Sequence, residues 1–437
     1  MKLLVYADKI SPRLDYVFQH IFHDQLGLII EFTDSKIIFS KSKNYKINYS
    51  KKAFSDELFF YAHDLLFQDD IISQDLVFSH YKNVAIFFLC TNSALPFDPF
   101  ASIFYMISRY EEYLINQRDS FGRFSAKQSI SFKHGFLTVP VVDYWILFIQ
   151  DVLHKRFPDM TFKDKKFNFI NSIDIDNAYA YLGKGPFRII ASTLKDLLMT
   201  RFISIKSRIL VLFFNKKDPY DTYDSILQIH NKYNLHTIFF FLLGNYRFYD
   251  RSVHYSSSIL KENIKKLSLQ CSVGIHPSVN SIKKPYNLPI EISRLKSIVN
   301  VNINASRQHF LVLNLPYHYR NLIQNSVYND YSMGFVDSPG FRAGTSNKFL
   351  FFDLKSNSIT RLLIHPFCVM DISLNQYLKM SPESSLTLIK DIISHVKHVR
   401  GTFISIWHNE SLYYKEKWLH WDSVYENMIK YIMDAKN

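Results

Sequence analysis

At 437 residues the chain exceeds the size at which a single hydrophobic core usually stops growing, so we expect two domains. Hydrophobic residues make up 47% of the chain and charged residues 21%, with 39 Phe and 28 Tyr but only 11 Gly, which excludes a low-complexity or disordered protein. The cysteines Cys90, Cys271 and Cys368 are far apart and odd in number, which excludes a disulfide framework and a cysteine-type zinc finger.

The N-terminal residues do not resemble a targeting segment. Asp8, Lys9, Arg13 and Asp15 stand where a signal peptide would need its apolar core. The chain also contains no run of about 18 uncharged apolar residues, the length that a membrane-spanning helix requires. We therefore expect a cytoplasmic protein that has neither a signal peptide nor a transmembrane helix.

The net charge of +13 is unevenly distributed. Residues 1–165 contain 19 Lys and Arg and 19 Asp and Glu, so the whole excess lies in 166–437, and 184–217 contains eight basic residues but one acid. Such a basic segment is either a solvated face or a site for phosphates, anionic lipid or acidic glycans. Within it, 187–214 mixes basic and apolar residues at helical spacing, as an interfacial helix does. An anionic membrane surface is thus a candidate partner, and nucleic acid is the less favoured one.

The first third of the chain alternates short apolar runs with helical patterns. The sequence predicts strands at 3–7, 28–32, 36–40 and 84–90, and helices at 11–26, 101–117 and 140–157. A polar stretch at 157–166, interrupted by Pro158, then separates this part from the rest. We place the domain boundary there, which gives an accessory α/β domain with a helical connector over 1–165.

The second part, 166–437, alternates strands and helices more regularly. Predicted strands lie at 167–174, 236–243, 271–276, 307–313, 361–367 and 402–408. Predicted helices lie at 223–234, 288–300, 316–325, 381–399 and 421–435. This alternation indicates a parallel β/α arrangement, and a barrel fits the number of strands.

Polar side chains gather where these strands begin or end, in strand order: Asp174, Asp176, His276, Arg307, His309 and His408. In a β/α barrel the carboxyl ends of the strands meet at one rim, where such enzymes carry out their chemistry. Each residue alone could be a hydrogen-bonded structural residue or a cap. Together, at successive strand ends, they predict a site.

The residue types at this rim suit a metal-dependent hydrolase. In SIDIDN (172–177), Asp174 and Asp176 face the same side of an ideal strand, so one carboxylate can bind a cation while the other acts as a base. One Asp and two His suit a zinc-like divalent ion that has open positions for water and substrate. His408, which ends a strand, can serve as a general acid.

These motifs resemble the polysaccharide deacetylase superfamily (carbohydrate esterase family 4), and the resemblance covers 166–437. SIDIDN (172–177), IHPS (275–278), SRQHF (306–310), GFRAGT (340–345) and WHNE (407–410) carry it, in this order. The family fold is an irregular (β/α)7 barrel. With an α/β domain before the barrel, the chain is similar to polysaccharide deacetylase-like proteins of Bacteroidetes-type bacteria.

The resemblance also implies roles for individual residues. Asp174 would be the general base, His408 the general acid, and Arg307 the arginine that orients the base. Arg342, in GFRAGT, would bind substrate or pair with an active-site carboxylate. The implied ligands of a divalent metal ion, with zinc as the first candidate, are Asp176, His276 and His309.

The assignment of His309 follows from a departure from the family pattern. The family has an H-x-x-x-H metal motif, but here Asn280 stands four residues after His276. His309 is the substitute for the missing histidine. The implied reaction is the removal of N-acetyl groups from a glycan or sugar. The alternative is a catalytically degenerate barrel that binds a glycan or a lipid-linked sugar without turnover.

Overall fold

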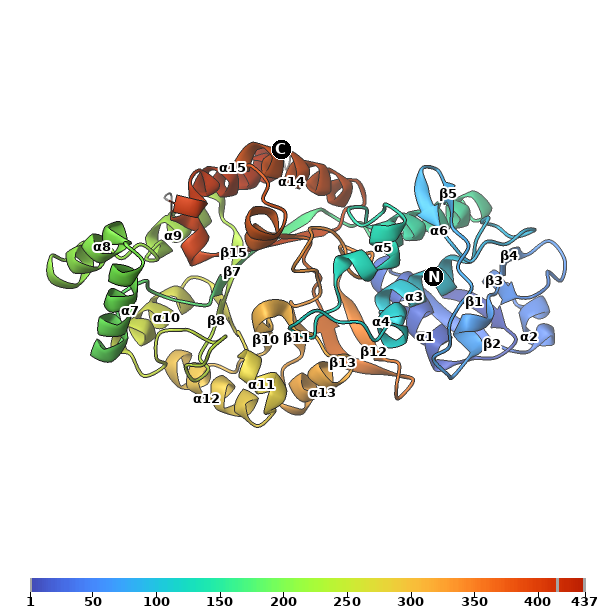
Figure 1. Cartoon of the computed structure of the whole chain (residues 1–437). Helices are drawn as coiled ribbons and strands as arrows, with labels where there is room; N and C mark the ends of the chain where they lie inside the picture. Colours follow the sequence, from blue (N-terminus) through green and yellow to red (C-terminus); the bar gives the residue numbers. More distant parts are fainter. Residues whose placement is uncertain (1, 414–415, 435–437) are drawn as a thin grey trace.

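The computed structural model describes residues 2–413 and 416–434 and shows a mixed α/β protein (Figure 1). The strands form a four-stranded sheet near the N-terminus, a nine-stranded sheet built from residues after 166, and a two-stranded hairpin. In Figure 1 the small sheet lies at one end of the molecule and the large sheet in the middle. No helix among the described residues is long and apolar enough to cross a membrane.

The small sheet is entirely parallel and has the order β2-β1-β3-β4. Its core is rich in aromatic side chains, including Phe18 stacked on Phe100 with ring centroids 4.3 Å apart. Its strands are β1 (Lys2–Ala7), β2 (Ile29–Thr33), β3 (Tyr45–Ser50) and β4 (Leu58–Tyr61), and β5 (Ser79–Tyr81) and β6 (Val84–Ile86) form the hairpin. The helices of this part are α1 (Pro12–Phe18), continued by η1 (Gln19–Gln25), α2 (Lys36–Lys41), α3 (Pro99–Ile107), α4 (Tyr110–Leu114), α5 (Ile130–Lys133) and α6 (Val141–Arg156).

The strand predicted at 36–40 is wrong, because these residues form helix α2. The hydroxyl oxygen of Ser35 accepts a hydrogen bond from the backbone N–H of Ile38 and so caps the helix. Only Phe39 of this helix is buried, whereas Ile37 and Ile38 are exposed. The apolar run at 37–39 therefore suggested a strand, although only the side chain of Phe39 enters the core.

The large sheet has the order β12-β13-β11-β10-β9-β8-β7-β15-β14. All neighbouring strands are parallel except β12 and β13. The strands are β7 (Asn168–Ile175), β8 (His236–Phe241), β9 (Ser272–Ile275), β10 (Ala305–Ser306), β11 (Asn329–Asp330), β12 (Phe349–Asp353), β13 (Ser358–Ile364), β14 (Val369–Met370) and β15 (Thr402–His408). This confirms the predicted parallel α/β arrangement.

Closing this sheet into a barrel would require one more ladder, between the edge strands β12 and β14. The strand pairing of the described residues contains no such ladder. The hydrogen-bonded sheet is therefore open at this point, and the (β/α)7 barrel stays a prediction.

Helices alternate with the strands of the large sheet, and several of them bury apolar side chains against it. Trp407 of β15, for example, packs against Tyr425 of α15 with ring centroids 5.1 Å apart. The helices are α7 (Pro186–Leu198), α8 (Phe202–Phe213), α9 (Tyr223–Tyr233), α10 (Ser258–Ser268), α11 (Val279–Lys283), α12 (Asn287–Val299), α13 (Tyr317–Gln324), α14 (Pro382–His398) and α15 (Trp421–Asp434). The last residue of the helix predicted at 421–435 lies outside the described residues.

The strand predicted at 307–313 is also wrong. Strand β10 ends at Ser306, and His309–Leu311 form a single 3-10 turn, η4. Phe310 and Leu311 have φ values of 58° and 52°, which a strand does not allow. The turn replaces the alternation of a strand, and His309 lies on the turn.

The single basic helix expected over 187–214 is instead a pair. Helix α7 ends at Leu198 and α8 begins at Phe202, with Thr200 between them at a φ of 54°. In Figure 1 the two helices lie at the end of the molecule opposite to the small sheet.

The N-terminal part packs against the large sheet through a shared apolar core. Phe104 of α3 contacts Phe352 of β12 with ring centroids 5.2 Å apart, and the Tyr16 hydroxyl donates a hydrogen bond to the carbonyl oxygen of Leu350. The boundary between 165 and 166 stays a prediction.

Candidate metal centre and active site

The carboxyl ends of parallel strands bring the predicted site residues to one rim. Asp174 lies at the end of β7, opposite His408 of β15 in the strand register. His276 directly follows β9, and Arg307 directly follows β10. Because β15, β7, β8, β9 and β10 are neighbours in this order, their ends meet on the same side of the sheet.

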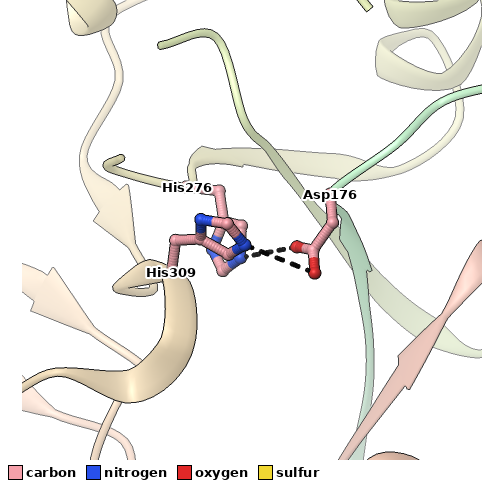
Figure 2. A group of neighbouring side chains, drawn as sticks. All are labelled: Asp176, His276 and His309. Atoms are coloured by element: carbon pink, nitrogen blue, oxygen red, sulfur yellow. Dashed lines mark ion pairs between the residues drawn. The ribbon is translucent and has the colours of Figure 1, made fainter. Parts of the chain in front are cut away.

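Asp176, His276 and His309 form a compact group (Figure 2). The Nε2 atom of His276 lies 3.0 Å from Oδ1 of Asp176, and Nε2 of His309 lies 3.5 Å from Oδ2. One potential ligand atom from each residue lies within 4.8 Å of the others. Three side chains from three separate strand ends thus converge on one point.

Hydrogen bonds on the far side of each imidazole fix which nitrogen faces this point. Nδ1 of His276 lies 2.5 Å from the carbonyl oxygen of Arg307, and Nδ1 of His309 lies 2.9 Å from Oδ1 of Asp250. Since both partners are acceptors, each Nδ1 carries a hydrogen, and each Nε2 is the nitrogen that faces Asp176 and can bind a metal when it carries no proton. This arrangement is typical of metal-ligating histidines.

The carboxylate of Asp176 is partly buried and suits a cation. Its Oδ1 atom is shielded from solvent and faces Nε2 of His276 at 3.0 Å. Burial opposes its ionisation, but His309 and His276 outweigh that effect and hold the pKa of Asp176 well below its ordinary value. A divalent ion fits this position, because a donor set of one carboxylate and two imidazoles suits zinc and related metals.

His309 is strongly basic in the metal-free protein. Burial lowers its pKa, but the charges of Asp176 and Asp250 outweigh burial and raise the pKa of His309 to about 9. At neutral pH a metal would therefore displace a proton from this imidazole.

Asp174 lies beside this group and is held by Arg307. An Nη1–H of Arg307 donates to Oδ1 of Asp174 at 3.0 Å, and its Nε–H donates to the carbonyl oxygen of Tyr331 at 3.0 Å. Both side chains are buried. Oδ2 of Asp174 lies 4.0 Å from Nε2 of His276, so the second carboxylate stays next to the candidate metal position without being in the converging group.

His408 lies on the other side of Asp176 and is held by Asp371. Nδ1 of His408 lies 2.8 Å from Oδ1 of Asp371, and its backbone N–H donates to Oδ2 of the same carboxylate. Nε2 of His408 therefore faces the site, 3.8 Å from Oδ2 of Asp176. Burial lowers the pKa of His408, but Asp371 and Asp176 outweigh burial and raise it to about 10, so the ring carries a proton at neutral pH. A cation bound by Asp176 would offset part of this rise.

Six of the seven predicted site residues thus come together, and Arg342 does not. Its Nε–H and Nη2–H donate to the two oxygens of Glu112, at 2.8 and 2.6 Å, and an Nη1–H donates to the carbonyl oxygen of Gly334. Arg109 shares the same carboxylate. Contrary to the expectation that Arg342 pairs with an active-site carboxylate or binds substrate, its buried guanidinium is paired with Glu112 of α4.

Asn280 contacts the network around His309 through its backbone. Its backbone N–H donates to Oδ2 of Asp250. The same carboxylate accepts from the backbone N–H of Val279 and binds His309. Asp250 therefore links Asn280, which stands where the family pattern has its second histidine, to His309.

Sequence reasoning missed both second-layer carboxylates, Asp250 and Asp371. Asp371 directly follows the short strand β14, so it carries the same strand-end signal as the other site residues, but the two-residue strand gave too short an apolar run to be recognised. Asp250 lies in an irregular polar segment between β8 and α10, where no periodicity marks it.

Comparison with known proteins adds the following findings. Residues 3–158 match a family of unknown function, DUF7033. No curated protein matches the chain. Among solved structures the chain is similar to a candidate polysaccharide deacetylase from Mycobacterium smegmatis, with a TM-score of 0.41 and 12% identity over 62% of this chain and 85% of that one.

Two further solved structures are similar over 62% of this chain. One is a polysaccharide deacetylase from Bacillus cereus, with a TM-score of 0.32 and 8% identity over 89% of that chain. The other is the Xyl-CE4 domain of a multidomain xylanase from the hindgut metagenome of Trinervitermes trinervoides, with a TM-score of 0.28 and 12% identity over 83% of that chain. With TM-scores this low, these likenesses transfer no activity to the present chain.

Proposed function

We propose that this protein is a metal-dependent hydrolase that removes N-acetyl groups from a carbohydrate. The observation that carries the proposal is the convergence of Asp176, His276 and His309, with both imidazole Nε2 atoms turned toward the carboxylate of Asp176. A held base and a held acid flank this group, which is the set that amide hydrolysis needs.

In this proposal Asp176, His276 and His309 hold a divalent ion, with zinc as the first candidate. Such an ion would supply Lewis-acid polarisation of the acetamido carbonyl and lower the pKa of a nearby water. Asp250 fixes the tautomer of His309, and the carbonyl oxygen of Arg307 fixes that of His276. These outer contacts keep the ligand atoms oriented before any metal binds.

The remaining residues move protons. Asp174, oriented by Arg307, accepts a proton from the attacking water, whose oxygen forms a bond to the carbonyl carbon. His408, held protonated by Asp371, gives a proton to the amine nitrogen as the C–N bond breaks. The products are acetate and a free amino sugar, and the water supplies the atoms that both products gain.

We further propose that 166–437 form the irregular (β/α)7 barrel and that 1–165 are an accessory α/β domain. The strand order supports the barrel, because β14, β15 and β7–β11 follow each other around the sheet. Only the junction between the edge strands β12 and β14 lacks a ladder among the described residues.

A second candidate function is glycan binding without turnover. The presence of Asn280 where the family pattern has a second histidine favours it. The retention of Asp174, His408 and their partners Arg307 and Asp371 favours catalysis, because a binding site has no need to hold a base and an acid in place.

Release of acetate from N-acetylated chitooligosaccharides separates these two candidates. We expect release by the zinc-loaded protein and its loss after treatment with a chelator, with recovery on adding zinc. A protein that binds both zinc and the oligosaccharide but releases no acetate would support the binding function instead.

A further inference from the structure

Helices α7 and α8 form a hairpin whose apolar side chains have no cover. None of the residues of α7 is buried, and Phe187, Leu198 and Ile203 are 87%, 86% and 81% exposed. The exposed large apolar residues of the hairpin are Phe187, Ile190, Leu194, Leu197, Leu198, Met199, Phe202, Ile203, Ile209, Phe213 and Phe214. The spacing of those in α7 places them along one stripe of the helix. A contiguous apolar surface of this kind marks an interaction site.

The hairpin is nevertheless a built structure. Arg208 of α8 is buried and reaches across to α7, where its Nη2–H donates to Asp196 at 2.5 Å and its Nη1–H donates to the hydroxyl of Thr193 at 2.7 Å. The guanidinium of Arg208 also lies over the ring of Tyr181. These contacts fix the two helices against each other and leave their apolar stripe facing outward.

The charges around the stripe are positive. Lys195, Arg201, Lys206 and Lys216 are exposed, and none of them forms an ion pair among the described residues. The single acid of the segment, Asp196, is already paired with Arg208. A partner that covers this stripe must therefore offer an apolar region to the stripe and negative charge to the cations beside it.

We propose that the α7–α8 hairpin docks the protein on an anionic lipid membrane. Leu198, Met199, Phe202 and Ile203 stand at and beside the turn between the helices, so the apolar surface includes a tip. A tip with cations beside it suits insertion between lipid headgroups, where acyl chains accept the apolar side chains and anionic headgroups meet the lysines and arginine.

The hairpin is also tied to the rim that carries the candidate site. It is inserted between β7, which ends beside Asp176, and α9. At its base, the carboxylate of Asp218 accepts hydrogen bonds from the backbone N–H groups of Ala180, Tyr181 and Leu182. The amide of Asn409, the residue after His408, donates to the carbonyl oxygens of Asn177 and Tyr220 on both arms of this base. Docking through the tip of the hairpin therefore holds this rim about one helix length, roughly 20 Å, from the membrane.

The substrate class follows from this placement and rests on the proposed function. A site that is tied to a membrane-docking element suits a substrate carried in the same membrane. We accordingly assign the substrate as an N-acetylated glycan linked to a lipid, in contrast to a freely soluble polysaccharide.

The experiment uses the full-length protein loaded with zinc and sedimented with vesicles. Vesicles of phosphatidylcholine with phosphatidylglycerol should bind the protein at low salt, and vesicles of phosphatidylcholine alone should bind it much less. Raising the salt to about 1 M, where the Debye length falls to about 3 Å, should weaken binding to the anionic vesicles.

Two variants and a matched control locate the contact. Lys195→Gln with Lys206→Gln should lower partitioning about 30-fold, because each cation near an anionic surface contributes about 1 kcal/mol. Leu198→Ser with Ile203→Ser should lower it about 10-fold or more. Lys41→Gln with Lys43→Gln removes the same charge at and just after the end of α2, the helix at the opposite end of the molecule in Figure 1, and should leave partitioning unchanged.

The substrate part is tested by acetate release from one N-acetylated sugar in two forms, a soluble oligosaccharide and a glycolipid carried in the anionic vesicles. We expect the hairpin variants to lose activity on the glycolipid and to keep it on the soluble form. Equal activity of wild type and variants on both forms would overturn the lipid-linked assignment.

The two proposals fail in different ways. If the protein releases acetate but stays in solution with anionic vesicles, the docking proposal is wrong and the deacetylase proposal stands. If the protein binds vesicles through the hairpin but releases no acetate from either form, the deacetylase proposal and the substrate assignment fail and docking stands. Self-association that the hairpin variants abolish, without vesicle binding, would identify a second copy of the chain as the true occupant.

Discussion

Replacing His309 by alanine should abolish tight metal binding without unfolding the protein. His309 presents its Nε2 to Asp176, so the substitution leaves Asp176 and His276 as the only converging ligands. Asp250 loses its contact with the imidazole but keeps hydrogen bonds from the backbone N–H groups of Val279 and Asn280. The buried carboxylate is thus still bonded, and we expect the fold to survive.

The magnitude can be ranked from the geometry. Asp250→Asn removes the charge behind the His309 ring and one of the two acceptor oxygens, and losing such an outer partner typically costs about 10- to 100-fold in metal affinity. His309→Ala removes a ligand atom itself and should therefore cost more than about 100-fold. Asn280→Ala is the matched control, because only the backbone of Asn280 contacts this network and that contact is kept.

Zinc affinity of the three variants and the wild type is measured by competition with a chromophoric chelator, and far-UV circular dichroism monitors the fold. The expected order of loss is His309→Ala, then Asp250→Asn, then Asn280→Ala with almost none. An unchanged affinity in a folded His309→Ala variant would refute the ligand assignment. A large loss of zinc affinity in Asn280→Ala would show that position 280, where the family pattern has its second histidine, still contributes to metal binding.

Further predictions concern the two proton-transfer residues and the buried pair of Glu112 and Arg342. Asp174→Asn should keep zinc affinity but lower acetate release by about 100-fold or more; loss of the metal would mean that the roles of the two carboxylates are exchanged. His408→Ala should slow amide substrates more than activated aryl esters, whose leaving groups need no proton, and equal losses would leave His408 a structural role. Glu112→Gln should destabilise the fold by about 3–5 kcal/mol in urea denaturation, because it removes one partner of a buried ion pair with Arg342, whereas Glu426→Gln, on the surface, should cost less than about 1 kcal/mol. Although burial favours the neutral form of Glu112, its arginine partners lower its pKa to about 2, so about 3 kcal/mol of stability present above pH 4.5 should be lost as the pH falls toward 2, and a flat acid profile would contradict this.

The candidate site could be predicted because strand ends leave a clear trace in sequence. Long apolar runs such as β7 and β15 each end in an ionisable side chain, and the parallel topology brings those ends to one rim. The sequence placed Arg307 and His309 at the start of a strand over 307–313, so the family resemblance, and not the strand-end pattern, brought them into the predicted site. They lie at this rim because β10 ends at Ser306 and the chain turns there.

The parts that could not be predicted depend on contacts between distant residues. Arg342 lies in a motif of the expected family, but Glu112, far away in the chain, takes its guanidinium, and nothing near either residue indicates that pairing. The strand predicted at 36–40 failed because its apolar residues are mostly exposed, which periodicity does not report. Asp250 and Asp371 act through histidines that only the fold brings next to them.

The metal content of the protein tests the central claim most directly. We predict one divalent ion per chain in the wild type after purification or zinc loading, by elemental analysis with parallel protein quantification. The double variant His276→Ala with His309→Ala should bind none while keeping its circular dichroism spectrum. A folded wild type that takes up no ion from excess zinc, or a folded double variant that binds as much as the wild type, would contradict the assignment of this site.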